Sequence, residues 1–205
     1  MMLCVLYGLE DSSEINVGSV AANFKNWADG VPMGIGRHTY EVLSFWDYLL
    51  NPFKAAEIIW ELSGRESAAN GGIMRTSAVG LLKDNVREYA EKVYKLTHPD
   101  PRCIKSCILI SELISSLIWK DTELEYDDMV SVAENDAKFI SYLSKAKECD
   151  IISQLELDDP KFMGYTYKTM SAVFWGQSMD MLQFQRNMYK DYAILTCCKK
   201  YQMSD

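Results

Sequence analysis

Histidine is scarce in this chain of 205 residues, which contains only His38 and His98. Its six cysteines form no Cys-x-x-Cys pair. The sequence therefore predicts neither a zinc site nor a framework of disulfides. Cys103 and Cys107 fall on one side of a predicted helix. Two thiols placed in this way can bind a metal, but burial as small hydrophobic side chains is the more common use.

Long apolar runs and clustered positive charge are also missing. No apolar stretch reaches the roughly 20 residues needed to span a bilayer, and no basic segment of the signal-peptide type precedes the short hydrophobic run at the N-terminus. The formal net charge of -8 opposes binding to a nucleic acid backbone, which needs clustered lysine and arginine. We therefore expect a cytoplasmic protein with neither a nucleic-acid nor a membrane partner.

The remaining composition is that of a globular domain, with 48% hydrophobic and 24% charged residues. Strict alternation and hairpin turn pairs are absent, which favours an all-α fold in a single domain over residues 1–205. Apolar stripes at helical spacing mark the predicted helices: Val17, Val20, Ala21, Phe24 and Trp27; Val42, Leu43, Trp46, Leu49 and Leu50; Phe53, Ala56, Ile59 and Trp60; Val86, Tyr89, Ala90, Val93 and Tyr94; and Val132, Ala133, Phe139, Ile140 and Leu143.

Local signals place some helix ends and the centre of the fold. Asp11-Ser12-Ser13 can cap the first stripe, and Asn51-Pro52 is predicted to end the second. Residues 102–119 are apolar on nearly every face, so this helix is predicted to lie at the centre. A last helix over residues 181–198 can cover the bundle or pair with another chain.

The most informative stretch is residues 67–82. Asn70-Gly71-Gly72 suits a strained backbone and the close approach of a ligand, and Arg75 follows before a short apolar helical run. Backbone amides and a bidentate cation at a helix start favour an anion. An ordinary loop followed by a helix start explains the same spacing.

This stretch resembles the central Asn-Gly-x-x-Met-Arg motif of the ADP-ribosylglycohydrolase family, which includes the dinitrogenase-reductase-activating glycohydrolases and their J1-crystallin relatives. Residues 24–39, 96–101 and 164–175 are similar to further family segments in the same order. The resemblance is strongest over residues 1–175, and 176–205 is a divergent C-terminal helix. It implies an orthogonal helical bundle of the family's type.

The family's acidic motifs are not found beside these segments. In the family, two Mg²⁺ or Mn²⁺ ions are held by Thr-Asp-Asp-Thr near one end and Gly-Asp-x-Asp-Thr near the other. Residues 1–10 resemble the helix after the first motif, and the sequence after Trp175 lacks the second. We therefore expect a domain truncated at both ends, with no metal ligand assignable to it. The acidic residues Glu123, Glu125, Asp127 and Asp128 indicate a solvated loop and helix start, and Asp158-Asp159-Pro160 indicates a turn.

The resemblance implies a set of residues that bind the ligand. Within the central motif they are Asn70, Gly71, Gly72, Met74 and Arg75, and elsewhere they are Gly34, Gly36, His98, Gly164 and Tyr165.

Structural roles remain open for several of them. Arg75 can instead tie its loop to a neighbouring helix, and His98 can bond to backbone before Pro99. The glycine loop with Gly34 can be a simple helix connection, and Tyr165 can belong to the core rather than stack on an adenine.

Two functions follow from the resemblance. One is hydrolysis of the glycosidic bond between ADP-ribose and a protein side chain or small acceptor, which needs the missing acidic segments, for example from a partner chain. The other is a catalytically inactive module that binds ADP-ribose or an ADP-ribosylated protein. A helical interaction module without any ligand is a third possibility.

Overall fold

The structure is a computed structural model that describes residues 1–9, 13–30, 32–160, 162 and 164–178. Within these residues it is helical, with isolated β-bridges but no strand, so the all-α prediction is confirmed. The α-helices are α1 (Met2–Leu6), α2 (Val17–Asp29), α3 (Arg37–Leu43), α4 (Pro52–Leu62), α5 (Gly71–Thr76), α6 (Val86–Lys95), α7 (Pro101–Ser115), α8 (Tyr126–Ala133), α9 (Ala137–Glu148) and α10 (Thr166–Ser178). Short 3₁₀ segments are η1 (Ser77–Leu81) and η3 (Ile152–Leu155), and a π-helical turn is η2 (Ser116–Lys120).

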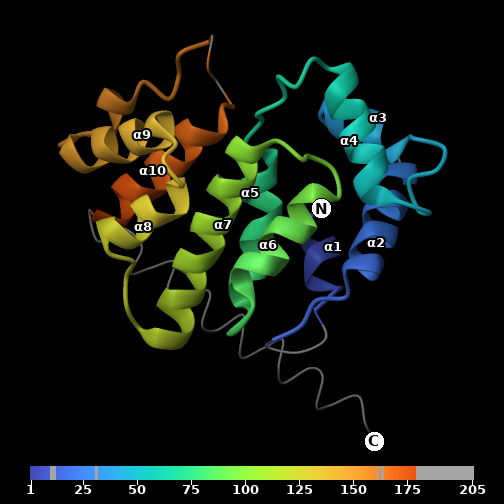
Figure 1. The fold of residues 1–205 in the computed structure, drawn as a ribbon, viewed down its shortest axis with the longest axis horizontal. Coiled ribbons are helices and arrows are strands. Elements are labelled where there is room, and N and C mark those ends of the chain that lie inside the picture. Colours follow the sequence, from blue (N-terminus) through green and yellow to red (C-terminus); the bar gives the residue numbers. More distant parts are fainter. Residues whose placement is uncertain (10–12, 31, 161, 163, 179–205) are drawn as a thin grey trace, which may run out of the picture.

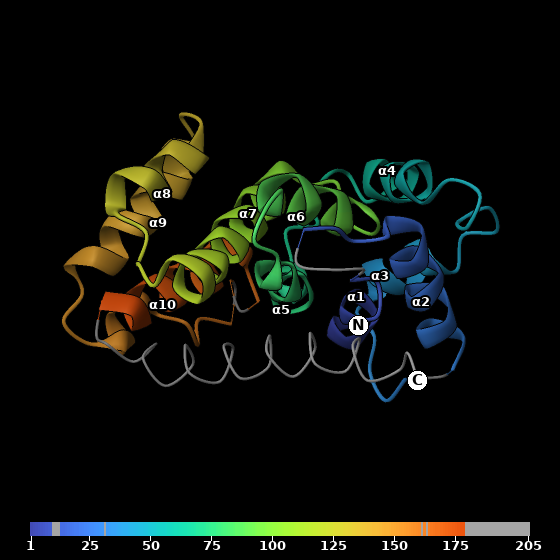
Figure 2. The ribbon, with the colours of Figure 1, turned by 90° about the horizontal axis from the view of Figure 1, so that it is seen from below.

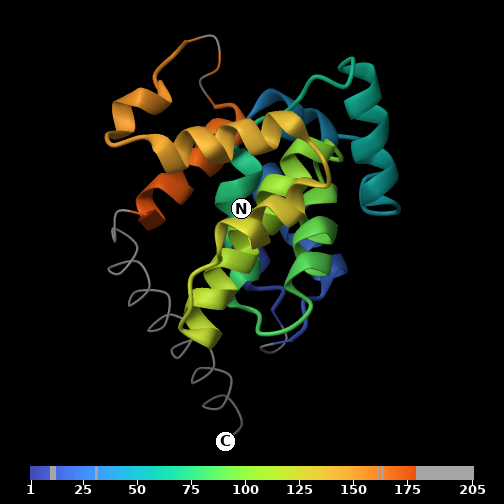
Figure 3. The same cartoon turned by 60° about the vertical axis from the view of Figure 1, so that its left-hand side comes forward.

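Helix α7 is the centre of the molecule, as its apolar sequence predicts. Figures 1 and 2 show it between α8, α9 and α10 on one side and α1 to α4 on the other, with α6 beside it. Helix α9 in turn lies against α10 (Figure 3). The predicted span of residues 102–119 continues beyond α7 into η2, where Trp119 is 38% exposed. None of the described helices is long and apolar enough to cross a membrane.

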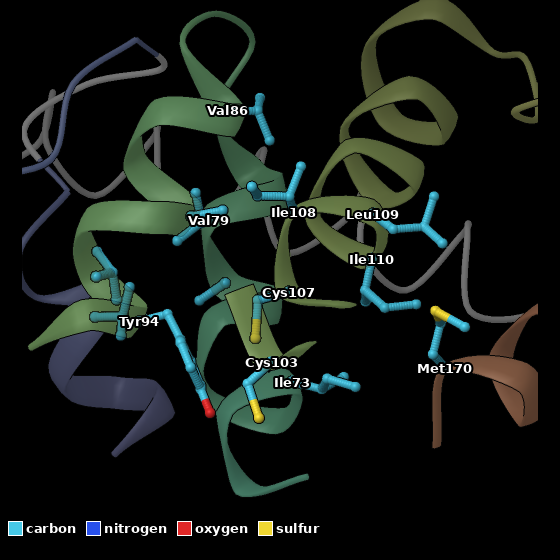
Figure 4. Close-up of a cluster of buried hydrophobic side chains, with 14 of the residues drawn as sticks. Ile73, Val79, Val86, Tyr94, Cys103, Cys107, Ile108, Leu109, Ile110 and Met170 are labelled. Atoms are coloured by element: carbon cyan, nitrogen blue, oxygen red, sulfur yellow. The ribbon is translucent and has the colours of Figure 1, made fainter. Parts of the chain in front are cut away.

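The core around α7 buries both cysteines of that helix. Cys103 and Cys107 lie with Tyr94, Ile73 and Met170 in one cluster (Figure 4). Both are free thiols, and burial raises the pKa of each to about 12. They therefore remain neutral and pack as small hydrophobic side chains.

Hydrogen bonds from α7 hold the segment after the central motif. Ser111 Oγ donates to the carbonyl of Thr76 over 3.1 Å, and Ser115 Oγ donates to the carbonyl of Leu82 over 2.7 Å. A Cβ on Gly80 would lie 2.5 Å from a side-chain carbon of α7, so the backbone of η1 runs directly against this helix. These contacts fix α5 and η1 relative to the core.

The loop before α5 is held by the segment that opens α10. The amide of Asn70 donates to the carbonyl of Gly164 over 2.8 Å, and the amide of Thr166 donates to the carbonyl of Ala68 over 3.1 Å. Asn70 Nδ2 also donates to Thr169 Oγ1 over 2.9 Å. Two family-like segments that are far apart in the sequence are thus joined in space.

The second predicted helix is wrong beyond Leu43, the second residue of its stripe. Helix α3 ends at Leu43, and turns connect it to Asn51, so Trp46 is 85% exposed; Leu49 and Leu50 are exposed as well. Asn51-Pro52 begins a helix rather than ending one, because the Asn51 side chain accepts from the amide of Lys54 and Pro52 occupies the first turn of α4.

Two further boundaries differ from the predictions. The stripe from Val132 to Leu143 is divided between α8 and α9, since Glu134 and Asn135 have positive φ and Asp136 caps α9. Asn16, not the predicted Asp11-Ser12-Ser13, caps α2 by accepting from the amide of Ser19. Residues 11 and 12 and the predicted helix 181–198 lie outside the described residues.

The acidic segments take the structural positions predicted for them. Glu125 precedes α8, and Asp127 and Asp128 occupy its first turn, where negative charge favours a helix start. Asp158 and Pro160 lie in turns before α10.

Candidate functional site

A cleft of about 750 Å³ lies between α3, α5 and the residues that follow α6. Most of the predicted ligand-binding residues line it: Gly34, Gly36, Asn70, Gly71, Met74, Arg75 and His98. The cleft therefore brings together the glycine loop before α3, the central motif and the segment before α7.

Gly72, Gly164 and Tyr165 do not line this cleft. A Cβ on Gly72 would fall 1.7 Å from a ring carbon of Tyr94, so this glycine allows α5 to pack on α6. Gly164 has a φ of +80° and anchors the Asn70 loop through its carbonyl. The ring of Tyr165 contacts Tyr142 and neighbouring aromatic rings, which matches the alternative of a packing role.

Arg75 forms the inner wall of the cleft and is 4% exposed. Its Nη2 donates to Thr97 Oγ1 over 2.5 Å and to His98 Nδ1 over 2.8 Å. Its guanidinium carbon lies 5.4 Å from the centre of the Tyr94 ring. Arg75 thus ties α5 to the segment after α6, as one of the two sequence interpretations predicts.

These contacts leave much of the Arg75 guanidinium without a partner. Its Nε is buried with no hydrogen bond, and no ion pair joins Arg75 to a carboxylate among the described residues. The buried carboxylate of Asp100 is already engaged by Arg102 over 2.6 Å. A buried charge without a counter-charge is costly, so the site is electrostatically incomplete as it stands.

Arg75 also decides which nitrogen of His98 carries the proton. Arginine can only donate, so His98 Nδ1 must accept and the neutral ring carries its proton on Nε2. Burial lowers the pKa of His98 well below its usual value, and the charge of Arg75 and the neighbouring His38 lower it further. A neutral imidazole that lines the cleft can therefore offer an N–H to an acceptor on a ligand.

His38 also lines the cleft, although no motif predicted a role for it. Its ring centre is 4.5 Å from that of His98, and both of its ring nitrogens are buried without a hydrogen bond. Burial is the main cause that lowers its pKa, although the backbone of Thr97 acts in the opposite direction. Its position two residues after Gly36, in a segment assigned to the site, was the available signal.

Carboxylates are sparse along the cleft. Among its lining residues they come from Glu41 and Glu66. Within the described part of the chain, no group of three or more His, Cys, Asp or Glu is placed to hold a metal ion. Magnesium and manganese need several oxygen ligands, so the described residues do not fit a divalent centre.

Comparison with known proteins adds one match. A family model described as ADP-ribosylglycohydrolase matches residues 1–186. No curated protein and no solved structure matched the chain. The matched residues include every segment that lines the cleft.

Proposed function

The chain belongs to the ADP-ribosylglycohydrolase family, and on that premise we propose that its cleft binds the ADP-ribose group of an ADP-ribosylated substrate without cleaving the glycosidic bond. The family acts on ADP-ribosylated substrates in general and is generally metal-dependent. Binding of ADP-ribose and cleavage of its glycosidic bond are therefore two separate steps, and we propose only the first for this cleft.

The observation that carries the proposal is the convergence of family-like segments on one cleft. Its volume of about 750 Å³ lies in the range of small-molecule sites, roughly 300–1,000 Å³. It presents the buried cation of Arg75, the N–H of neutral His98 and the bare backbone of Gly71. These groups complement a ligand with phosphates, hydroxyls and a base.

The donor set supports binding more than cleavage. Glycosidic cleavage needs an acid or an activated water and stabilisation of charge on the ribose. Glu41 and Glu66 are the carboxylates that the described residues bring to the cleft, and Glu41 already pairs with Arg37 over 3.4 Å. These two carboxylates do not form a two-ion centre.

Thermal unfolding in the presence of EDTA tests the binding. ADP-ribose at a hundred times its dissociation constant stabilises a protein by about 2.7 kcal/mol, so we expect a clear rise in Tm. His98→Asn removes the Nε2 donor and should reduce that rise, whereas Trp46→Gln, which lies outside the cleft, should not. An unchanged Tm of the wild-type protein at millimolar ADP-ribose contradicts the proposal.

Hydrolysis is the second candidate, because the family match itself favours it. Peptides carrying ADP-ribose on arginine or serine should release no ADP-ribose with magnesium beyond an EDTA control. Release above that control, lost on adding excess free ADP-ribose, would establish the hydrolase and refute the non-cleaving half of our proposal.

A further inference from the structure

We infer that Arg75 is the receptor for a phosphate group of the ligand, so that this guanidinium, rather than a divalent cation, meets the ligand's negative charge. The inference rests on the proposed function for placing a ligand in the cleft and assigns the chemistry that holds its charged part.

The Arg75 guanidinium lacks a counter-charge among the described residues. The Arg75 guanidinium is permanently charged and 4% exposed. Its two side-chain hydrogen bonds go to the hydroxyl of Thr97 and to neutral His98, and neither supplies negative charge. Because a buried charge needs a partner, an anion that enters the cleft gains more here than at an exposed arginine.

The described carboxylates near the cleft pair with other residues or form no ion pair with Arg75. Asp100 is held by Arg102, and Glu41 faces Arg37. Neither Glu41 nor Glu66 forms an ion pair with Arg75, although both line the same cleft. The described residues therefore leave the guanidinium open to an external anion.

An anion can approach Arg75 from the side of Gly71. Nη1 forms no hydrogen bond with a described residue, and it lies 3.9 Å from the point where a Cβ on Gly71 would be. Gly71 lines the cleft, so the bare backbone at this position leaves space in front of Nη1. A phosphate there can accept from the planar fork of an arginine, which suits phosphate geometry.

Calorimetric titration with inorganic pyrophosphate in EDTA tests this assignment without the rest of the nucleotide. Arg75→Gln removes the charge and should weaken pyrophosphate binding at least tenfold. Gly71→Ala adds a methyl group beside Nη1 without a clash, and it should weaken pyrophosphate binding several-fold without lowering Tm. Gly176→Ala in α10 is the matched control, since Gly176 lies outside the cleft, a Cβ there meets nothing within 4 Å, and pyrophosphate affinity should stay the same.

Comparing adenosine, pyrophosphate and ADP-ribose distinguishes a failure of this inference from a failure of the proposed function. Adenosine lacks the phosphates, so Arg75→Gln and Gly71→Ala should leave its affinity unchanged. Pyrophosphate that fails to bind, or that binds wild type, Arg75→Gln and Gly71→Ala equally, overturns the inference. If Arg75→Gln does not fold, the pyrophosphate affinity of Gly71→Ala compared with wild type tests the inference by itself. If pyrophosphate binds in an Arg75-dependent manner but ADP-ribose does not bind, the result contradicts the proposed function and supports the inference.

Discussion

At the scale of single residues, the adjacent glycines of the central motif have different physical roles. Gly71 lines the cleft and has open space around its missing side chain apart from Arg75. Gly72 is buried against the ring of Tyr94, where a Cβ would fall at 1.7 Å. One glycine thus leaves room for a ligand, and the other leaves room for a neighbouring helix.

Alanine substitutions should separate these roles. Gly72→Ala must displace a fully buried ring, and we expect a loss of roughly 1–3 kcal/mol in the free energy of unfolding. Gly71→Ala meets no such obstacle and, by reducing the freedom of the unfolded chain, should be neutral or stabilising by up to about 1 kcal/mol. Urea denaturation of both variants measures the difference, and equal losses would refute the assignment.

The pH dependence of stability should report on His98. Its folded-state pKa is lowered by burial, Arg75 and His38, so the unfolded chain takes up a proton more readily. The free energy of unfolding should therefore fall as the pH drops below about 6.5, by at most about 1.4 kcal/mol per pH unit for this group. Denaturation between pH 7.5 and pH 5 measures it.

His98→Asn is the control for that measurement. It should flatten the slope between pH 6.5 and 5, while a smaller slope of the same sign remains from His38, whose pKa burial also lowers. A slope identical to wild type would mean that His98 does not titrate in this range on unfolding.

The sequence predicted the composition of the site better than the role of each member. Asn70, Arg75 and His98 converge as expected, because family motifs mark which residues matter. A motif does not state what a residue packs against. Gly72 and Tyr165 were therefore assigned to the ligand, although Gly72 packs against the ring of Tyr94 and Tyr165 packs against the ring of Tyr142. The tautomer of His98 depends on the tertiary contact with Arg75, which sequence spacing does not encode.

At the scale of helices, apolar spacing was a good guide except where an irregular segment begins. Trp46, Leu49 and Leu50 continue the stripe of α3 in sequence, yet the chain turns after Leu43. Within that segment, the side chain of Tyr48 is fully buried. Turns break the helical period, so the stripe no longer identified the buried side.

This difference gives a paired prediction for the segment between α3 and α4. Trp46→Ala should change the free energy of unfolding by no more than about 0.5 kcal/mol, because the side chain is 85% exposed. Tyr48→Ala removes a fully buried ring and should cost about 3–5 kcal/mol. Chemical denaturation compares the two, and a greater loss for Trp46→Ala would place that tryptophan in a packed interface.

At the scale of the whole molecule, α7 explains both what was predictable and where the site lies. Its apolar faces identified it as central, and its serines hold the backbone at Thr76 and Leu82. The motif before Thr76 is therefore fixed between the core and α10. Residues of α1, α2 and α3 reach the cleft through contacts between distant segments, and local patterns did not reveal this arrangement.

The last prediction concerns divalent ions and the whole protein. Because the cleft contributes one buried cation and few carboxylates, magnesium alone should not raise Tm, and ADP-ribose should bind no more tightly in magnesium than in EDTA. Magnesium also complexes diphosphates in solution, so any effect should be a modest loss of apparent affinity. Thermal unfolding and calorimetry at 0 and 5 mM magnesium, with calcium as a matched ion, measure both quantities. A saturable rise in Tm with magnesium would require an oxygen-rich site, and the charge of the ligand would then have a second partner besides Arg75.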